Sequence, residues 1–189
     1  MSQQLLSFIQ QSIAVSQEEF DLILAYFKPL KLKKNHLLLD YGETSQRIFF
    51  ITSGCLRIFF INDDGQDATR HFAFENQMAT ALVSFITREA SGEFVQAMEE
   101  TELLSITHED FYGLLELLPK WEKFYRCYLE MAYVTSTSRL RSFLTLDSKE
   151  KYQQLLQENP RIVQRLPNKM VASYLNISQE TLSRLKSKV

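Results

Sequence analysis

A short polar segment near the C-terminus carries the residues best suited to recognition chemistry. In "NISQETLSRLKSKV", which runs from Asn176 to Val189, Glu180 and Arg184 are four residues apart and would share one face of a helix. An arginine can donate two hydrogen bonds to guanine O6 and N7, and a carboxylate can accept one from the cytosine amino group. The segment therefore predicts a helix that reads base edges in the major groove of DNA. A Glu180 that only orients Arg184, or that lies on a solvated face, is the open alternative.

Further polar residues around this segment could contact DNA, because hydroxyl, amide and ammonium groups donate to phosphate oxygens. They are Lys169, Ser178, Gln179, Thr181, Ser183, Lys186 and Lys188. Eight basic and three acidic residues give residues 148–189 a charge of +5, which leaves −7 for residues 1–147 of a chain whose formal net charge is −2. A basic tail on an acidic body is typical of polyanion binding, although chance variation of surface charge is an alternative.

The residues that precede this helix predict a second helix packed against it. Pro167 suits the first position of a helix, Asn176 tolerates the left-handed backbone of a sharp turn, and Ser178 can cap the helix that follows. The small side chain of Ala172 would let the two helices approach closely. The apolar residues expected between them are Val171, Leu175, Ile177, Leu182 and Leu185. This pattern predicts a helix-turn-helix, with a chance helical hairpin as the alternative.

The spacing of apolar residues changes twice along the chain, and these changes indicate the helices and strands that must position this motif. Up to residue 28, apolar residues recur at helical spacing and predict two short amphipathic helices. From Pro29 to Thr107, strand-like runs alternate with turn signals, and Asp64-Gly65 favours a hairpin. Many short strands at close spacing predict an antiparallel barrel or jelly roll. The expected fold class is therefore α+β.

Helical period returns after Thr107, first in a short helix that ends near Pro119. The next segment, "KWEKFYRCYLEMAYVTSTSRLRSFLTL", has no Gly or Pro over about seven turns. Its apolar stripe could form a two-fold dimer packed like a short coiled coil, or it could lie against the chain's own barrel. The residues predicted to line the dimer interface are Trp121, Phe124, Tyr128, Met131 and Thr135. Ser148 is expected to cap a further helix that ends at Asn159.

Several other classes of function have little support in the sequence. No long apolar run or signal peptide is present, so a cytoplasmic protein without a membrane span is expected. Cys55 and Cys127 have no metal-binding spacing and are expected to be buried apolar side chains. An enzyme with a cupin barrel would need clustered ligands, and the three histidines lack that spacing. His71 could face a barrel cavity but is expected to be structural. We therefore predict no enzyme activity, no cofactor and no metal.

Taken together, these motifs resemble the cyclic-AMP-receptor/Fnr (Crp/Fnr) family of bacterial transcription regulators. "GETSQRIFFITSGCLRIFF" is similar to a strand pair of the family's jelly roll, and Glu180, Ser183 and Arg184 match the Glu-x-x-Ser-Arg pattern of its Fnr branch. The resemblance implies a homodimer on a palindromic operator, a small-molecule effector, and RNA polymerase as an additional partner. It also implies three parts: a cyclic-nucleotide-binding-like jelly roll at 1–118, a connecting dimerisation helix at 119–146, and a helix-turn-helix at 147–189.

The chain also departs from this family pattern. Relatives that bind a cyclic nucleotide carry a Glu and an Arg in the loop that holds the cyclic phosphate, where this chain has Ala81 or Leu82 and Ser91 or Gly92. Arg88 and Glu89 are weak candidates for effector binding. No response to cyclic AMP is expected, and no iron–sulfur cluster, because the family's N-terminal cysteines are missing. The sequence stops soon after the recognition helix, so a truncated winged helix is expected. An effector-binding protein without DNA binding remains the alternative.

Overall fold

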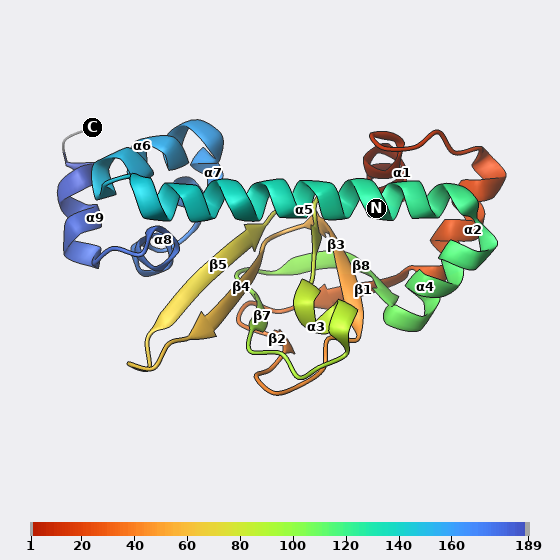
Figure 1. The fold of residues 1–189 in the computed structure, drawn as a ribbon, viewed down its shortest axis with the longest axis horizontal. Coiled ribbons are helices and arrows are strands. Elements are labelled where there is room, and N and C mark those ends of the chain that lie inside the picture. Colours follow the sequence, from red (N-terminus) through yellow and green to blue (C-terminus); the bar gives the residue numbers. More distant parts are fainter. Residues whose placement is uncertain (1, 188–189) are drawn as a thin grey trace. The chain divides into compact units, whose positions relative to one another are not determined.

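A computed structural model describes residues 2–187, which divide into two compact units (Figure 1). The first unit comprises Met1–Ile58 and Phe72–Leu129, and the second comprises Phe59–His71 and Glu130–Val189. The boundaries differ from the three parts predicted from the sequence. One boundary falls inside the long helix, between Leu129 and Glu130. The second unit also includes residues 59–71, a hairpin from the middle of the chain, because this hairpin packs with the C-terminal helices.

Helices dominate both ends of the chain and strands its middle. The helices are α1 (Ser2–Gln10), α2 (Gln17–Tyr26), α3 (Leu82–Thr87), α4 (His108–Leu117), α5 (Pro119–Thr145), α6 (Ser148–Glu158), α7 (Pro160–Arg165), α8 (Asn168–Leu175) and α9 (Gln179–Lys186). The strands are β1 (Lys28–Leu32), β2 (Leu37–Leu39), β3 (Arg47–Ser53), β4 (Leu56–Ile61), β5 (Asp67–Ala73), β6 (Met78–Ala79), β7 (Phe94–Ala97) and β8 (Thr101–Thr107). The order confirms the predicted α+β class.

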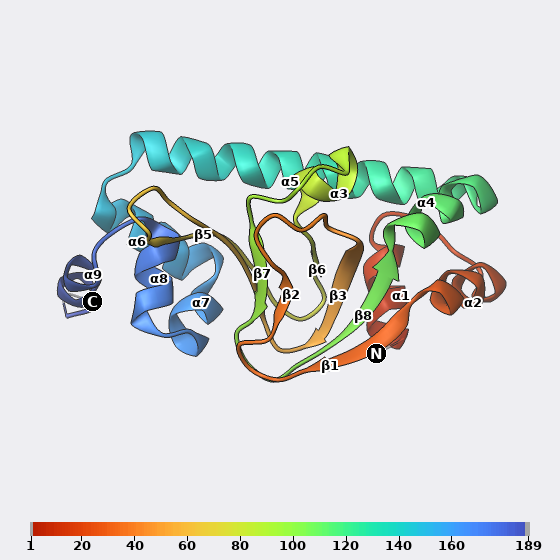
Figure 2. The same cartoon turned by 90° about the horizontal axis from the view of Figure 1, so that it is seen from below.

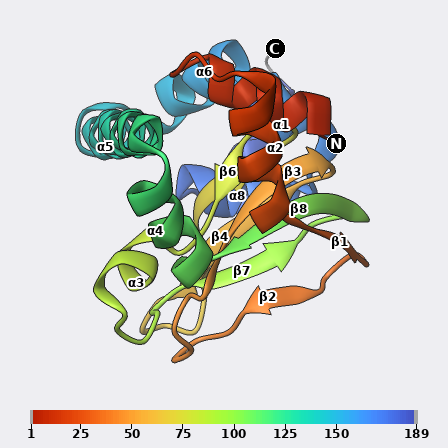
Figure 3. The same cartoon turned by 90° about the vertical axis from the view of Figure 1, so that its right-hand side faces the viewer.

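The strands form two four-stranded sheets, which Figures 2 and 3 show from two sides. One sheet has the order β1-β8-β3-β6 and the other has the order β2-β7-β4-β5. The strand pairs β1–β8, β3–β8, β3–β6 and β2–β7 are all antiparallel. Neighbours in each sheet are mostly distant in sequence, as expected for a jelly roll rather than a meander. The predicted jelly roll is confirmed.

Two turns in the jelly roll need glycine for a physical reason. Gly54 has φ +101°, and a Cβ there would lie 2.5 Å from Thr101 Oγ1 and 2.8 Å from the Glu100 carbonyl oxygen. No other residue fits that contact without movement of the backbone. Gly65 has φ +74° in the loop between β4 and β5, which confirms the hairpin predicted at Asp64-Gly65.

An aromatic core joins the helices of the first unit to its sheet. Phe111 lies 5.4 Å from Trp121 and 5.9 Å from Phe85 between ring centroids, and Trp121 stacks on Phe124 at 4.5 Å. All four side chains are almost fully buried, together with Phe50 of β3. The predicted N-terminal helices are confirmed, and they supply Leu5, Ile9, Phe20 and Ile23 to this same core. The first turns of α5 are therefore part of the core of the first unit.

The second unit contains the rest of α5, the outer part of the β4–β5 hairpin and helices α6 to α9. Its core includes Tyr152, Leu155 and Ile162. Asp147, and not Ser148, caps α6, so the sequence prediction was wrong by one residue. The Asp147 carboxylate accepts hydrogen bonds from two backbone amides, those of Lys149 and Glu150, and a charged acceptor is favoured at the positive end of a helix.

Candidate nucleic-acid interface

Helices α8 and α9 form the predicted helix-turn-helix. Asn176 ends α8 with φ 52° and ψ 51°, the left-handed conformation expected from its residue type. The Ile177 amide donates to the Ala172 carbonyl at 3.1 Å, which closes the turn, and Ser178 Oγ accepts from the Thr181 amide at 3.1 Å to cap α9. These bonds are local in sequence, so residue types alone were enough to predict the turn.

The two faces of α9 differ as the motif requires. Leu182 is fully buried and Leu185 is half-buried. The buried residues Val171, Ala172 and Leu175 of α8 complete the apolar contact. The exposed predicted contacts are Ser178, Gln179, Glu180, Ser183 and Arg184, to which α8 adds Lys169. Thr181 and Lys186 are partly buried, and Lys188 lies outside the described residues.

Within the described chain, no hydrogen bond or ion pair joins Glu180 to Arg184 or engages either side chain elsewhere. Both charged groups are therefore available to a ligand, as base reading would require. Lys186 is different, because its Nζ donates to Asn168 Oδ1 at 2.6 Å across the two helices. Part of its donor capacity thus stabilises the motif itself. The DNA contacts of all these residues stay predictions.

A polar contact that the sequence did not predict holds α8 from behind. Arg139 of α5 donates from Nη2 to the Tyr174 carbonyl at 2.7 Å and to the Thr69 carbonyl at 3.0 Å. Its guanidinium lies over the rings of Tyr174 and Phe143, with Cζ 3.7 and 4.8 Å from their centroids. Burial lowers the pKa of Arg139, an effect that Tyr174 opposes. Arg139 therefore ties the end of α8 to α5 and to β5.

The β5 strand makes a second contact with α8. Ser173 Oγ donates to the Asp67 carbonyl at 2.7 Å and accepts from the Thr69 amide at 3.0 Å, so it pairs with the strand as a neighbouring backbone would. Nearby, burial lowers the pKa of His71 to about 4, with additional repulsion from Arg70 and Arg139. The imidazole is neutral at pH 7. More than 100 residues separate Ser173 from Asp67, and no sequence spacing could have revealed this contact.

The long helix corrects the predicted dimer interface. Trp121 and Phe124 are 0% and 2% exposed in the core of the first unit, so a second copy could not reach them and that part of the prediction was wrong. Tyr128 packs against the same core. Met131 is exposed, and Thr135 is exposed on the wall of a cavity described below, so their place in an interface stays a prediction.

Sequence reasoning missed another apolar stripe on the same helix. Tyr133, Leu140 and Leu144 are 73%, 57% and 77% exposed. They are spaced by seven and four residues, which puts them on one face at 100° per residue. This is the spacing of a coiled-coil seam, and it could have been found by scanning α5 for a second stripe.

The loop that corresponds to the cyclic phosphate site in relatives is built from internal hydrogen bonds. Ser84 Oγ donates to the Glu89 carbonyl, and Ser91 Oγ donates to the Glu93 carbonyl at 3.0 Å. Arg88 has a left-handed backbone and donates to the carbonyls of Ser45 and Phe85 at 2.7 and 3.2 Å. Its guanidinium is thus committed to protein acceptors, which weakens the suggestion that it binds an effector. No geometry supports Glu89 in that role either.

Other sequence predictions concern metals, cysteines and membranes. Among the described residues, no group of His, Cys, Asp and Glu is arranged to hold a metal ion. Both cysteines are free; Cys55 is buried as predicted, whereas Cys127 is only partly buried. No helix in the described part of the chain combines the length and apolar character needed to cross a bilayer.

Comparisons with known proteins agree with this geometry. Residues 29–117 match the family model of the cyclic nucleotide-binding domain. The cyclic AMP receptor protein of Thermus thermophilus is 29% identical over 105 residues, which cover 56% of this chain and 48% of that protein. The match thus spans about half the length of this curated relative.

Solved structures extend the likeness to almost the full chain. The c-di-GMP-responsive regulator CLP of Xanthomonas campestris has a TM-score of 0.73 at 15% identity, covering 92% of this chain and 91% of that one. A regulator described as crp/fnr family from Eubacterium rectale has a TM-score of 0.70 at 17% identity, covering 90% and 82%. At such identities the likeness concerns the fold. Residues 29–117 thus match the cyclic nucleotide-binding domain, and the solved structures show that the chain shares the fold of these regulators, as the resemblance seen in the sequence implies.

Proposed function

We propose that this chain is a sequence-specific, double-stranded-DNA-binding transcription regulator of the Crp/Fnr type. The observation that carries the proposal is the polarity of α9: Leu182 is buried against α8, while Glu180 and Arg184 on the other side are exposed and engaged with no other residue among those described. Such a helix is fixed to the protein through its apolar face and presents groups that can read base edges on its exposed face. Such a role implies a location in the cytoplasm, with the chromosome.

We further propose a homodimer that pairs the Tyr133–Leu140–Leu144 stripe of one α5 with the same stripe of a second copy. Three large apolar side chains at coiled-coil spacing are costly to leave in water, and a two-fold contact would cover both copies at once. A symmetric dimer presents two recognition helices to a palindromic operator.

The test begins with selection of bound duplexes from a random pool by the full chain. We expect an inverted repeat, which would supply the operator for affinity measurements. Arg184→Ala should then weaken operator binding by about 1–3 kcal/mol and relax the preference at one base pair of each half-site. Arg126→Ala removes another exposed arginine, from the first unit, and should leave affinity unchanged. Equal losses for both variants would contradict base reading by α9.

The alternative function is an effector-binding protein that does not contact DNA, which the acidic first part of the chain favours. Salt dependence separates the two possibilities. A dimer that neutralises several phosphates should lose orders of magnitude in affinity between about 50 and 200 mM salt. A chain that retains no duplex even at low salt would belong to the alternative. The relatives named above are regulators rather than enzymes, and among the described residues no group of His, Cys, Asp and Glu could hold a catalytic metal ion.

A further inference from the structure

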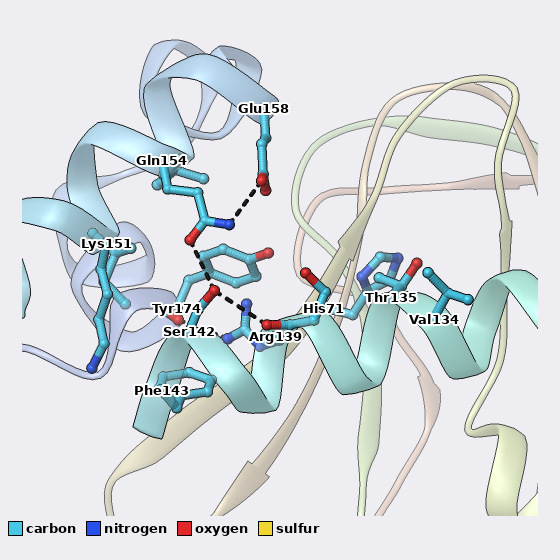
Figure 4. Close-up of a pocket in the computed structure, with 13 residues that line it drawn as sticks. His71, Val134, Thr135, Arg139, Ser142, Phe143, Lys151, Gln154, Glu158 and Tyr174 are labelled. Atoms are coloured by element: carbon cyan, nitrogen blue, oxygen red, sulfur yellow. Dashed lines mark hydrogen bonds between the residues drawn. The ribbon is translucent and has the colours of Figure 1, made fainter. Parts of the chain in front are cut away.

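A cavity of about 300 Å³ lies in the second unit, and all the residues that line it belong to that unit. Its walls come from α5, α6, α8 and His71 of β5 (Figure 4). The volume is at the small end of the range for ligand pockets, so it suits a compact molecule. Leu155, Leu175 and the rings of Phe143 and Tyr174 make part of the wall apolar.

The polar part of the wall is rich in donors. Two cations flank one ring: Arg139 Cζ lies 4.8 Å and Lys151 Nζ lies 5.2 Å from the centroid of Phe143. Arg139 uses only Nη2 for its two carbonyl acceptors, and its Nε and Nη1 have no acceptor among the described residues. A guanidinium that is held by stacking and keeps free donors is prepared to bind an oxyanion, because little side-chain freedom is lost on binding.

The balance of charge in the wall sets the charge of the ligand. Arg139 and Lys151 are positive, and Glu158 is negative and accepts a hydrogen bond from Gln154 Nε2 at 2.7 Å. The neutral imidazole of His71 adds no charge at pH 7. The wall therefore carries about one net positive charge, which favours a monoanion over a phosphate dianion.

We propose that this cavity binds a small organic monocarboxylate, with its carboxylate on Arg139, its apolar body between Phe143, Leu155 and Leu175, and Lys151 adding positive charge to the wall. Such a ligand would satisfy the free donors of Arg139 and cover the apolar wall in one step. The binding claim stands on the cavity itself. Its regulatory meaning rests on the proposed function, because Arg139 also holds the Tyr174 carbonyl at the end of α8, where the helix-turn-helix begins its turn.

The cavity would remain accessible in the proposed dimer. Thr135, Ser138 and Ser142 on its wall lie on one face of α5, whereas Tyr133, Leu140 and Leu144 lie on the opposite face at 100° per residue. A second copy packed on that stripe would not cover the cavity. A ligand on Arg139 could thus change how firmly α8 is held without displacing the second copy. If the ligand makes different contacts in two positions of α8, it will shift the population towards the position that it binds more tightly.

Titration calorimetry of the full-length protein without DNA tests the binding step. Benzoate serves as the probe carboxylate, and benzyl alcohol and phenyl phosphate serve as probes of similar shape with zero and about two negative charges. We expect saturable binding of benzoate in the millimolar range or tighter, with each of the other probes at least about tenfold weaker. Absence of saturable benzoate binding, or tighter binding of either comparison probe, would overturn the proposal.

Variants locate the site without disturbing the anchor made by Arg139. Lys151→Met should weaken benzoate binding about tenfold, and Ser138→Leu should abolish it by filling the cavity from an exposed position of α5. Lys149→Met removes an exposed lysine from the same helix and should bind benzoate as the parent does. Unchanged binding in both cavity variants refutes the site. Because no DNA is present, this result is independent of whether the chain is a regulator.

Discussion

The two halves of α5 have similar apolar content but different surroundings. In residues 119–129, Trp121 and Phe124 are buried in the aromatic core of the first unit. In residues 130–145, Tyr133, Leu140 and Leu144 are exposed, and Arg139 forms a polar contact with α8 and β5. One continuous helix thus serves as core at one end and as contact surface at the other. Apolar periodicity indicates that a face will be covered; it does not indicate by what.

The largest expected effect is on the buried half. Trp121→Ala should lower the free energy of unfolding of the protein by about 3–5 kcal/mol, because it removes a fully buried indole from contact with Phe111 and Phe124. Urea unfolding measures the loss. Under native conditions the oligomeric state should not change. If the variant instead dissociates into monomers with no loss of stability, Trp121 belongs to the dimer interface and the two halves of α5 do not differ in this way.

The next effect concerns His71, which lies beside Arg70 and Arg139 in the second unit. Burial lowers the pKa of His71 to about 4 in the folded protein, from a value near 6.5 in the unfolded chain. Between pH 4 and pH 6.5 the imidazole is therefore protonated in the unfolded chain and neutral in the folded one. Stability should be intact above pH 6.5 and fall by up to about 3 kcal/mol towards pH 4 through this group alone. Denaturant titrations of the protein and of His71→Gln should show the smaller pH slope in the variant. Identical slopes would contradict a buried neutral imidazole.

A charged side chain introduced in residues 130–145 of α5 should weaken the dimer and leave the stability of the folded chain unchanged. Leu140→Glu should weaken dimerisation by about 2 kcal/mol or more, because it sets two carboxylates against each other where two leucines would be covered. Sedimentation equilibrium measures the change. Lys123→Glu alters an exposed position on the buried half and should leave the dimer intact. If both variants dissociate equally, the stripe from Tyr133 to Leu144 is not the contact.

The smallest effect tests a single hydrogen bond in the buried half. The hydroxyls of Tyr112 and Tyr125 lie 3.1 Å apart, and burial together with this bond raises the pKa of Tyr125 above its usual value. Tyr125→Phe should cost about 1 kcal/mol of stability by thermal or urea unfolding. Tyr41→Phe is the matched control, since Tyr41 is 69% exposed and its change should be neutral. A Tyr125→Phe protein as stable as its parent would show that the hydroxyl pair contributes nothing.

Local structure was the part that residue types could predict. Asn176 in the left-handed conformation, Ser178 as a cap and Leu182 as a buried side chain were all expected from the sequence, and the structure agrees. The jelly roll followed in the same way from the change of apolar period and from Asp64-Gly65. The bonds of the α8–α9 turn and the apolar alternation of each strand lie within a few residues, so backbone preference and side-chain type determine them, whereas the pairing of the strands joins distant segments.

Contacts between distant segments were decided by the tertiary structure. Ser173 meets Asp67 and Thr69, and Arg139 meets Thr69 and Tyr174, across separations that no spacing encodes. The same holds for the burial of Trp121, because a stripe suited to a partner helix is equally suited to the chain's own core. The sequence by itself determined the local elements and the polar face of α9. Only the fold decided which faces were left exposed, because that depends on how separate elements pack around shared cores.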